Sequence, residues 1–132
     1  MFSLVLAVGI AIGLIVSQII SAQQAPLKTT RLQTMGLTGI EGKEAVILLV
    51  EMAPGAVSAK NYHHGDEFGY ILEGSKILDV EGKLPATYKA GETYHVPPKQ
   101  PHFSTNLSTT APAKVLVFLV VDKGQPISVP VK

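Results

Sequence analysis

Cysteine and tryptophan are both absent from this chain of 132 residues. Without cysteine the protein cannot form a disulfide, a thiolate metal site or a thiol nucleophile, and its sequence fits any redox compartment.

An excess of charge of one sign is also missing. Lys and Arg number 11 against 10 Asp and Glu, which gives a formal charge of +1. The basic residues are scattered and form no stripe, so we expect no nucleic-acid partner. The sequence has no Ser–His–Asp spacing and no glycine-rich phosphate loop. Serine hydrolase chemistry and nucleotide binding therefore lack support.

One long apolar run lies at the N-terminus, where Leu4 to Val16 contains only apolar residues and glycine. Its length suits the core of a secretory signal, with Ser21 and Ala22 before a cleavage point. The alternative is an uncleaved anchor, since Phe2 to Ile20 is long enough for a membrane span of roughly 17–25 residues. We expect residues 1–26 to be a signal peptide or an anchor helix. The protein would then be exported, periplasmic or secreted, or held in the inner membrane by residues 2–20.

Residues 27–132 read as one β domain. Short runs rich in Val, Ile, Leu and aromatic residues recur with Gly and Pro turn signals every 8 to 12 residues, and no sustained helical period appears. This pattern favours an all-β sandwich or barrel. The predicted strands are 44–52, 68–72, 77–81, 87–89, 93–96, 102–106 and 114–121.

Two clusters of polar residues interrupt these strands, at 61–67 and 97–106. Because side chains alternate along a strand, Asn61 and His63 share one face and His64 points to the other. Gly65 and Asp66 form a plausible turn, after which Glu67 begins the next strand.

On the second cluster, His102 shares a face with Ser104 and Asn106. If both strands face the barrel interior, His63, Glu67 and His102 converge on one point. Such a set with open positions suits Fe, Mn, Zn, Ni or Cu and does not choose among them.

The stretch Gly55…His63-x3-Glu67-x6-Gly74 resembles the first motif of the cupin superfamily, and Gly91-x5-Pro97-x4-His102-x3-Asn106 resembles the second. The resemblance covers essentially all of 27–132 and is closest to small, single-domain, exported bacterial cupins. It implies a double-stranded β-helix, or jelly-roll barrel, with a metal inside in most members. It also implies a homodimer formed through the outer sheets, with 44–52 or 114–121 at the contact.

The resemblance implies that the second histidine of the first cupin motif is His63 and that the glutamate of this motif is Glu67. It implies that the histidine of the second motif is His102. The family's first histidine falls on Asn61, whose amide oxygen is a weaker ligand for divalent transition metals. His64 is a possible substitute, but strand alternation turns it away from the interior unless a bulge rotates the strand.

Two functions follow. The first is a metal-dependent enzyme of the dioxygenase, isomerase or lyase class, acting on a small polar substrate, with Glu67 as a ligand or a general base. The alternative is a non-catalytic module that binds a small molecule or a metal, with Asn61 marking a degenerate site. Outside this set we expect Asn106 to fasten its turn, His95 to be a packed strand residue, and the hydroxyls of Tyr70 and Tyr94 to reach a partner.

Overall fold

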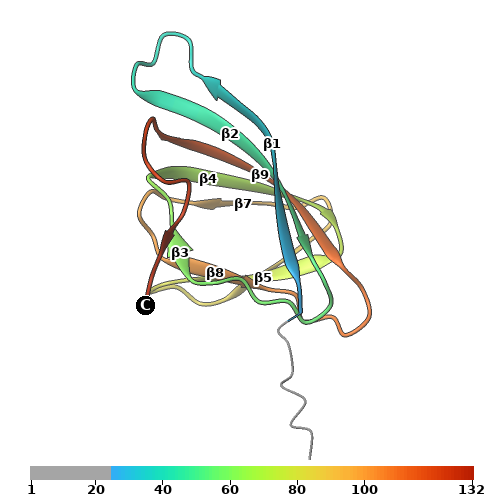
Figure 1. The fold of residues 1–132 in the computed structure, drawn as a ribbon. Coiled ribbons are helices and arrows are strands. Elements are labelled where there is room, and N and C mark those ends of the chain that lie inside the picture. The colour runs from blue at the N-terminus through green and yellow to red at the C-terminus, as the bar shows by residue number, and fades with distance from the viewer. Residues whose placement is uncertain (1–24) are drawn as a thin grey trace, which may run out of the picture.

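The computed structural model describes residues 25–132, which form two facing antiparallel β-sheets (Figure 1). The predicted all-β fold is confirmed for this part of the chain. Its strands are β1 (Leu27–Gly36), β2 (Lys43–Met52), β3 (Asn61–Tyr62), β4 (Gly65–Glu73), β5 (Ser75–Val80), β6 (Ala86–Lys89), β7 (Thr93–Val96), β8 (His102–Thr105), β9 (Ala113–Asp122) and β10 (Val129–Pro130).

The predicted signal peptide or anchor falls on residues 1–26 and so lies almost wholly outside the described residues. Within residues 25–132, no helix has the length and apolarity that a membrane crossing requires.

Each sheet has five strands, and strands distant in sequence lie side by side. The first sheet runs β1-β2-β9-β4-β7 and the second runs β10-β3-β8-β5-β6. Figure 1 shows the two sheets as separate layers, with β2, β9, β4 and β7 facing β3, β8 and β5. This order places β4 in one layer and β3 and β8 in the other, so the two motif regions meet across the interior.

The core lies between the two sheets. Because alternate side chains of a strand point to opposite faces, every second residue of a strand enters this core. In β9 every second side chain is buried, from Ala113 to Val121, and β2 contributes Val46 and Leu48 to the same core. Because alternate residues of β4, β5 and β8 also face inward, polar side chains at those positions enter the same interior. The inward polar residues are Lys76, Glu67, His102 and Ser104.

The predicted turn at Gly65 and Asp66 is wrong. Both residues already belong to β4, and the bend lies one step earlier, at His63 and His64. Gly65 is needed for packing, because a Cβ there would lie 1.8 Å from the carbonyl oxygen of Val120 on β9. Its glycine therefore reflects a close approach between strands, which the sequence pattern does not distinguish from a turn.

Candidate metal centre

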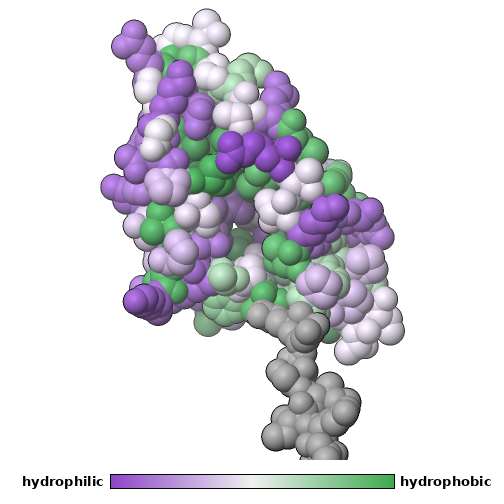
Figure 2. Space-filling model, in the orientation of Figure 1, coloured by the Kyte–Doolittle hydropathy of each residue, from purple (hydrophilic) through white to green (hydrophobic). Residues whose placement is uncertain are grey.

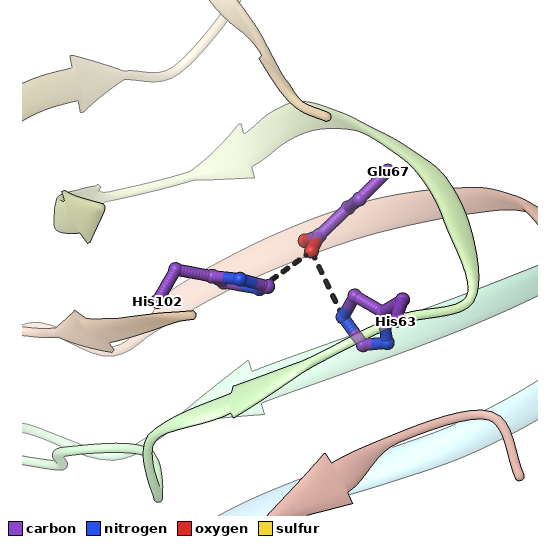
Figure 3. A group of neighbouring side chains, drawn as sticks. All are labelled: His63, Glu67 and His102. Carbon is purple, nitrogen blue, oxygen red and sulfur yellow. Dashed lines mark ion pairs between the residues drawn. The ribbon is translucent and has the colours of Figure 1, made fainter. Parts of the chain in front are cut away.

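Three side chains from different parts of the interior point toward one another (Figure 3). Glu67 comes from β4, His102 from β8, and His63 from the segment that joins β3 to β4. One potential ligand atom from each lies within 4.8 Å of the others, and the group could hold a metal ion. The structure therefore brings together the three residues that the sequence singled out.

The carboxylate of Glu67 is the centre of the cluster. Its Oε2 lies 3.0 Å from His63 Nε2 and 2.8 Å from His102 Nε2. Only 5% of Glu67 and 6% of His102 is exposed. A buried carboxylate requires hydrogen bonds or a positive charge nearby. Whether the two imidazoles are neutral or protonated therefore decides whether they donate to Glu67 or leave it free to bind a cation.

Backbone carbonyls fix the tautomer of both imidazoles. His63 Nδ1 lies 2.6 Å from the carbonyl oxygen of Ile127, and His102 Nδ1 lies 2.8 Å from that of Gln100. A carbonyl oxygen only accepts hydrogen bonds, so each Nδ1 must carry the proton. In the neutral rings both Nε2 atoms then direct lone pairs at the cluster, as is usual for histidines that bind a metal.

With both rings neutral, Glu67 Oε2 is a buried acceptor without a hydrogen-bond donor. Glu67 Oε2 then lies close to two imidazole nitrogens that also carry lone pairs, and these contacts are repulsive. A cation between the three atoms would remove the repulsion. Ligand atoms in adjacent positions, each about 2.1 Å from an ion, lie roughly 3.0 Å apart. The observed distances of 3.0 and 2.8 Å fit that arrangement.

In the metal-free cluster, protons take the place of the cation. Burial opposes the charge on His63, but the hydrogen bond to Glu67 and its negative charge outweigh this effect and raise the pKa of His63. Burial also opposes the charge on Glu67. The hydrogen bonds from His102 and His63 and the positive charges of His102 and Lys76 outweigh it, and they lower the pKa of Glu67 well below its usual range.

Asn61 lines the same cavity as His63, Glu67 and His102. It pairs with His102 across β3 and β8, so the sequence placed it correctly next to the site. Its Nδ2 donates to the carbonyl of Ala59 at 3.2 Å, while its Oδ1 is buried and accepts no hydrogen bond. The cavity thus holds a second free oxygen acceptor beside Glu67 Oε2.

His64 does not join the cluster. Its ring packs edge-to-face against Tyr62, with the ring centroids 5.6 Å apart, and it is absent from the residues that line the cavity. Its carbonyl oxygen accepts a hydrogen bond from the backbone N–H of Asp122, which fixes the bend in this orientation. The prediction that His64 points away from the interior therefore holds, and the register of the neighbouring strands shows no bulge at this position that would rotate it inward.

Of the two tyrosines predicted to have a partner for their hydroxyl, one does and one lies exposed. Tyr94 is buried and its hydroxyl donates to Glu67 Oε1 at 2.7 Å, whereas Tyr70 lies exposed on the outer face. Burial and the adjacent Glu67 raise the pKa of Tyr94, which keeps the hydroxyl protonated as a donor. His95 also lies outside, where it pairs with Asp66 at 2.7 Å and stacks on Phe68.

Asn106 fastens its turn, as the sequence predicted. Its Nδ2 lies within hydrogen-bond distance of the carbonyl oxygens of Met52, Ala53 and Ala111, and its Oδ1 accepts from the N–H of Ser108. It is fully buried and supplies no group to the metal cluster.

Two residues that form part of the site were not predicted from the sequence. Lys76 lines the cavity from β5, and the signal for it was present, since it alternates with the apolar Leu78 and Val80. Ile127 provides the carbonyl that orients His63, and no side-chain pattern could indicate a backbone acceptor in the segment before β10.

The cavity extends from the three ligands into an apolar region. Its volume is about 330 Å³. Figure 2 shows the molecule hollowed between the two layers on the face in view. Besides His63, Glu67 and His102, the wall contains a set of apolar residues: Leu27, Leu48, Val50, Met52, Val115 and Val117.

Comparison with solved structures gives the same architecture. A cupin-like protein from Thermotoga maritima is 15% identical, with a TM-score of 0.65, and the match covers 82% of this chain and 77% of that one. A cupin superfamily protein from Desulfitobacterium hafniense is 17% identical, with a TM-score of 0.59 and coverage of 78% and 84%. These likenesses concern the fold.

The enzyme DMSP lyase DddQ from Ruegeria pomeroyi is also similar, at 21% identity and a TM-score of 0.63. The match covers 79% of this chain but only 51% of the lyase, so this chain spans about half the length of that enzyme. No curated protein is similar enough in sequence to be matched with this chain.

The family comparison is more direct, because it rests on sequence. The family model described as the cupin domain matches residues 48–121, more than half of the 132 residues. That span contains both motif regions and all three converging side chains. The chain therefore belongs to the cupin family.

Proposed function

We propose that this cupin binds a divalent transition-metal ion through His63, Glu67 and His102, and a small ligand in the adjoining cavity. The observation that carries the proposal is the donor set. Two imidazoles with fixed tautomers and a carboxylate oxygen without a donor converge at 2.8 to 3.0 Å. Two histidines and one carboxylate with open positions suit Fe, Mn, Zn, Ni or Cu, and the donor set does not choose among them.

Asn61 supplies a weak fourth donor in this proposal. Its free Oδ1 faces the same cavity, and an amide oxygen is a harder ligand than the imidazole that the family usually has there. The site would therefore hold its metal less tightly than a three-histidine site does. Open positions would remain for the oxygen atoms of a ligand.

The test is metal content and metal affinity of protein purified without a histidine tag. We expect about one metal ion per chain, and an affinity loss of more than about 100-fold in H102A, since even outer partners of a ligand are worth 10–100-fold. H95A is the matched control, because His95 lies on the outer face and pairs with Asp66. Folded, metal-free wild-type protein that gains no thermal stability from Fe(II), Mn(II), Zn(II), Ni(II) or Cu(II) would refute the metal site.

A second candidate function is metal-dependent catalysis on the ligand. The observation that favours it is the pair of protonated groups beside the ligands, the Tyr94 hydroxyl on Glu67 and the Lys76 ammonium in the cavity wall. A bound metal would polarise a ligand oxygen. The chain itself would orient Glu67 through Tyr94 and keep water out through its apolar wall.

The reaction would be of the lyase, isomerase or dioxygenase class. Because DMSP lyases share this fold, DMSP is the first substrate to assay. Turnover that is lost in both E67Q and H102A supports catalysis. A metal-loaded protein that binds small molecules and returns them unchanged supports the non-catalytic module.

A further inference from the structure

Lys76 is a charged side chain buried inside the barrel. It comes from β5, where only 5% of the residue is exposed, and it lines the same cavity as the three proposed metal ligands. Lysine is almost never fully buried without a paired charge, so its presence here requires an explanation.

The protein satisfies the ammonium only in part. Lys76 Nζ donates to Ser104 Oγ at 3.1 Å and lies 3.9 Å from the centre of the Tyr94 ring. An ammonium has three N–H donors, and no carboxylate within residues 25–132 forms an ion pair with it. Burial lowers the pKa of Lys76 to about 8, and the charge of Glu67 offsets part of that effect. The group is therefore still mainly cationic at neutral pH.

Two serines add hydroxyl donors to the cavity wall: Ser104 contacts Lys76, and Ser58 contacts the backbone of Ser104. Ser104 Oγ accepts the lysine hydrogen, which leaves its own O–H to donate. Ser58 Oγ accepts from the backbone N–H of Ser104 at 2.8 Å, so its O–H is also available. Both serines line the cavity. Together Lys76, Ser58 and Ser104 present one charged and two neutral donors.

The charges in the cavity do not balance. A divalent ion contributes +2, Glu67 contributes −1 and Lys76 contributes +1, while the two ligand imidazoles are neutral. The sum is +2 in a cavity whose other walls are uncharged. This sum rests on the proposed metal site for its first term. Buried charge of one sign is stabilised by a counter-ion of the other.

We propose that Lys76, Ser58 and Ser104 form a carboxylate subsite, and that the ligand of this cupin is a small carboxylic acid with an apolar chain. The carboxylate pairs with Lys76 and accepts from the two serines. The hydrocarbon part lies along the apolar wall of Leu48, Val50, Met52, Val115 and Val117. A cavity of about 330 Å³ restricts the ligand to a small molecule.

The test is calorimetric titration of the metal-loaded protein with straight-chain carboxylates from acetate to hexanoate and with the matching primary amides. We expect carboxylates to bind at least about tenfold more tightly than their amides, with affinity rising along the chain. K76M should reduce carboxylate affinity at least about tenfold and leave metal affinity within about threefold. K114M is the matched control, since Lys114 pairs with Glu73 at the surface.

Equal affinity of wild-type protein and K76M for carboxylates, or equal affinity of carboxylate and amide, would overturn the subsite. If K76M does not fold, the comparison of carboxylate with amide in metal-free wild-type protein decides the matter, because a bound metal would itself favour the carboxylate. If wild-type protein binds no metal, the proposed function fails separately. The same titrations on metal-free protein then still show whether carboxylate binding depends on Lys76.

Discussion

Asn61 is the residue that separates this chain from the usual cupin motif. Its side chain lines the cavity and its Oδ1 has no hydrogen-bond partner, so in the proposed site this amide oxygen is available as a weak fourth donor.

Replacing this amide with imidazole should strengthen the site. We expect N61H to bind Zn(II) or Fe(II) at least about tenfold more tightly, which corresponds to ~1.4 kcal/mol, because a nitrogen ligand replaces an amide oxygen. Competition titration with a chelator measures the change, and N61A is the control for removal of the amide alone. Unchanged affinity in N61H would mean that position 61 does not reach the ion.

Asn106 shows the opposite case, a conspicuous polar residue whose role is structural. N106A should lower the free energy of unfolding by roughly 1–3 kcal/mol, since it removes the amide donor that the carbonyls of Met52, Ala53 and Ala111 share. Urea denaturation measures the loss. Metal affinity per folded molecule should not change, and a large drop in that affinity would contradict the structural role.

At the scale of single elements, β4 connects the packing of the barrel to its site. Glu67 projects inward from this strand, and two positions later Gly69 lies against Tyr94 of β7. A Cβ at Gly69 would come within 2.0 Å of the Tyr94 ring, and the hydroxyl of that ring holds Glu67. The strand thus needs a glycine at 69 to let Tyr94 support the carboxylate.

G69A should therefore displace Tyr94 and disturb Glu67. Overpacking of this kind costs roughly 1–3 kcal/mol of stability, and we expect a loss of metal affinity of about 10–100-fold from the lost support of a ligand. Thermal denaturation and metal titration measure the two effects. G36A is a matched control, because a Cβ on Gly36 meets only the flexible end of Lys123. Equal behaviour of G69A and G36A would contradict this account.

At the scale of elements, the sequence predicted β2, β7 and β9 well, and each begins and ends within one residue of its predicted range. β2 and β9 are long runs rich in Val, Ile and Leu, and two prolines follow β7 at the edge of its sheet. β1 was missed, since most of its residues are exposed at the edge of the sheet and show no alternation. β10 was missed because it has only two residues, one of which is proline.

The part of the site that is made of histidine and glutamate side chains could be predicted from the sequence, because their residue types and spacing are visible there. His63, Glu67 and His102 stood out because imidazole and carboxylate are rare on inward positions of strands. Lys76 was not singled out, because the predicted strand began one residue after it. The carbonyls of Ile127 and Gln100, which fix the tautomers, belong to every residue and leave no trace in the sequence.

Considered as a whole molecule, the metal-free protein should show a pH dependence that arises in its centre. The raised pKa of His63 stabilises the fold fully below the ordinary value of 6.5 and loses this contribution as the pH rises through the raised value. The lowered pKa of Glu67 stabilises the fold above its ordinary value of 4.5, and this contribution is lost as the pH falls through the lowered value. Stability should be highest between these two ordinary values.

The measurement is urea denaturation of chelator-treated protein from about pH 5 to pH 8. The upper limit avoids the opposite effect of Lys76, whose lowered pKa makes stability rise above about pH 8. Stability should fall from pH 6.5 upward, and added metal should stabilise more at higher pH because it replaces those protons. E67Q should flatten the profile, whereas E73Q, at a surface pair, should not. A flat wild-type profile would contradict the coupling of His63 to Glu67.

The predicted homodimer also concerns the whole molecule, and we propose that a second copy covers the outer face of β4 and β9. Phe68 and Phe118 are direct neighbours across these strands, and both are exposed, with Tyr70 beside them. Such a patch favours association. Light scattering should give a dimeric mass for wild-type protein and a dissociation constant at least about tenfold higher for F118E. L84E, in an exposed loop, is the control. A monomeric wild-type protein would contradict the proposal.

Gly65 and Gly69 flank Glu67 two residues away on either side, and neither position has room for a Cβ. Selection on folding alone would therefore preserve both glycines in a descendant that had stopped using its metal, while the histidines and the glutamate were free to drift. Family membership in small cupins can outlast the chemistry for which the motif is known.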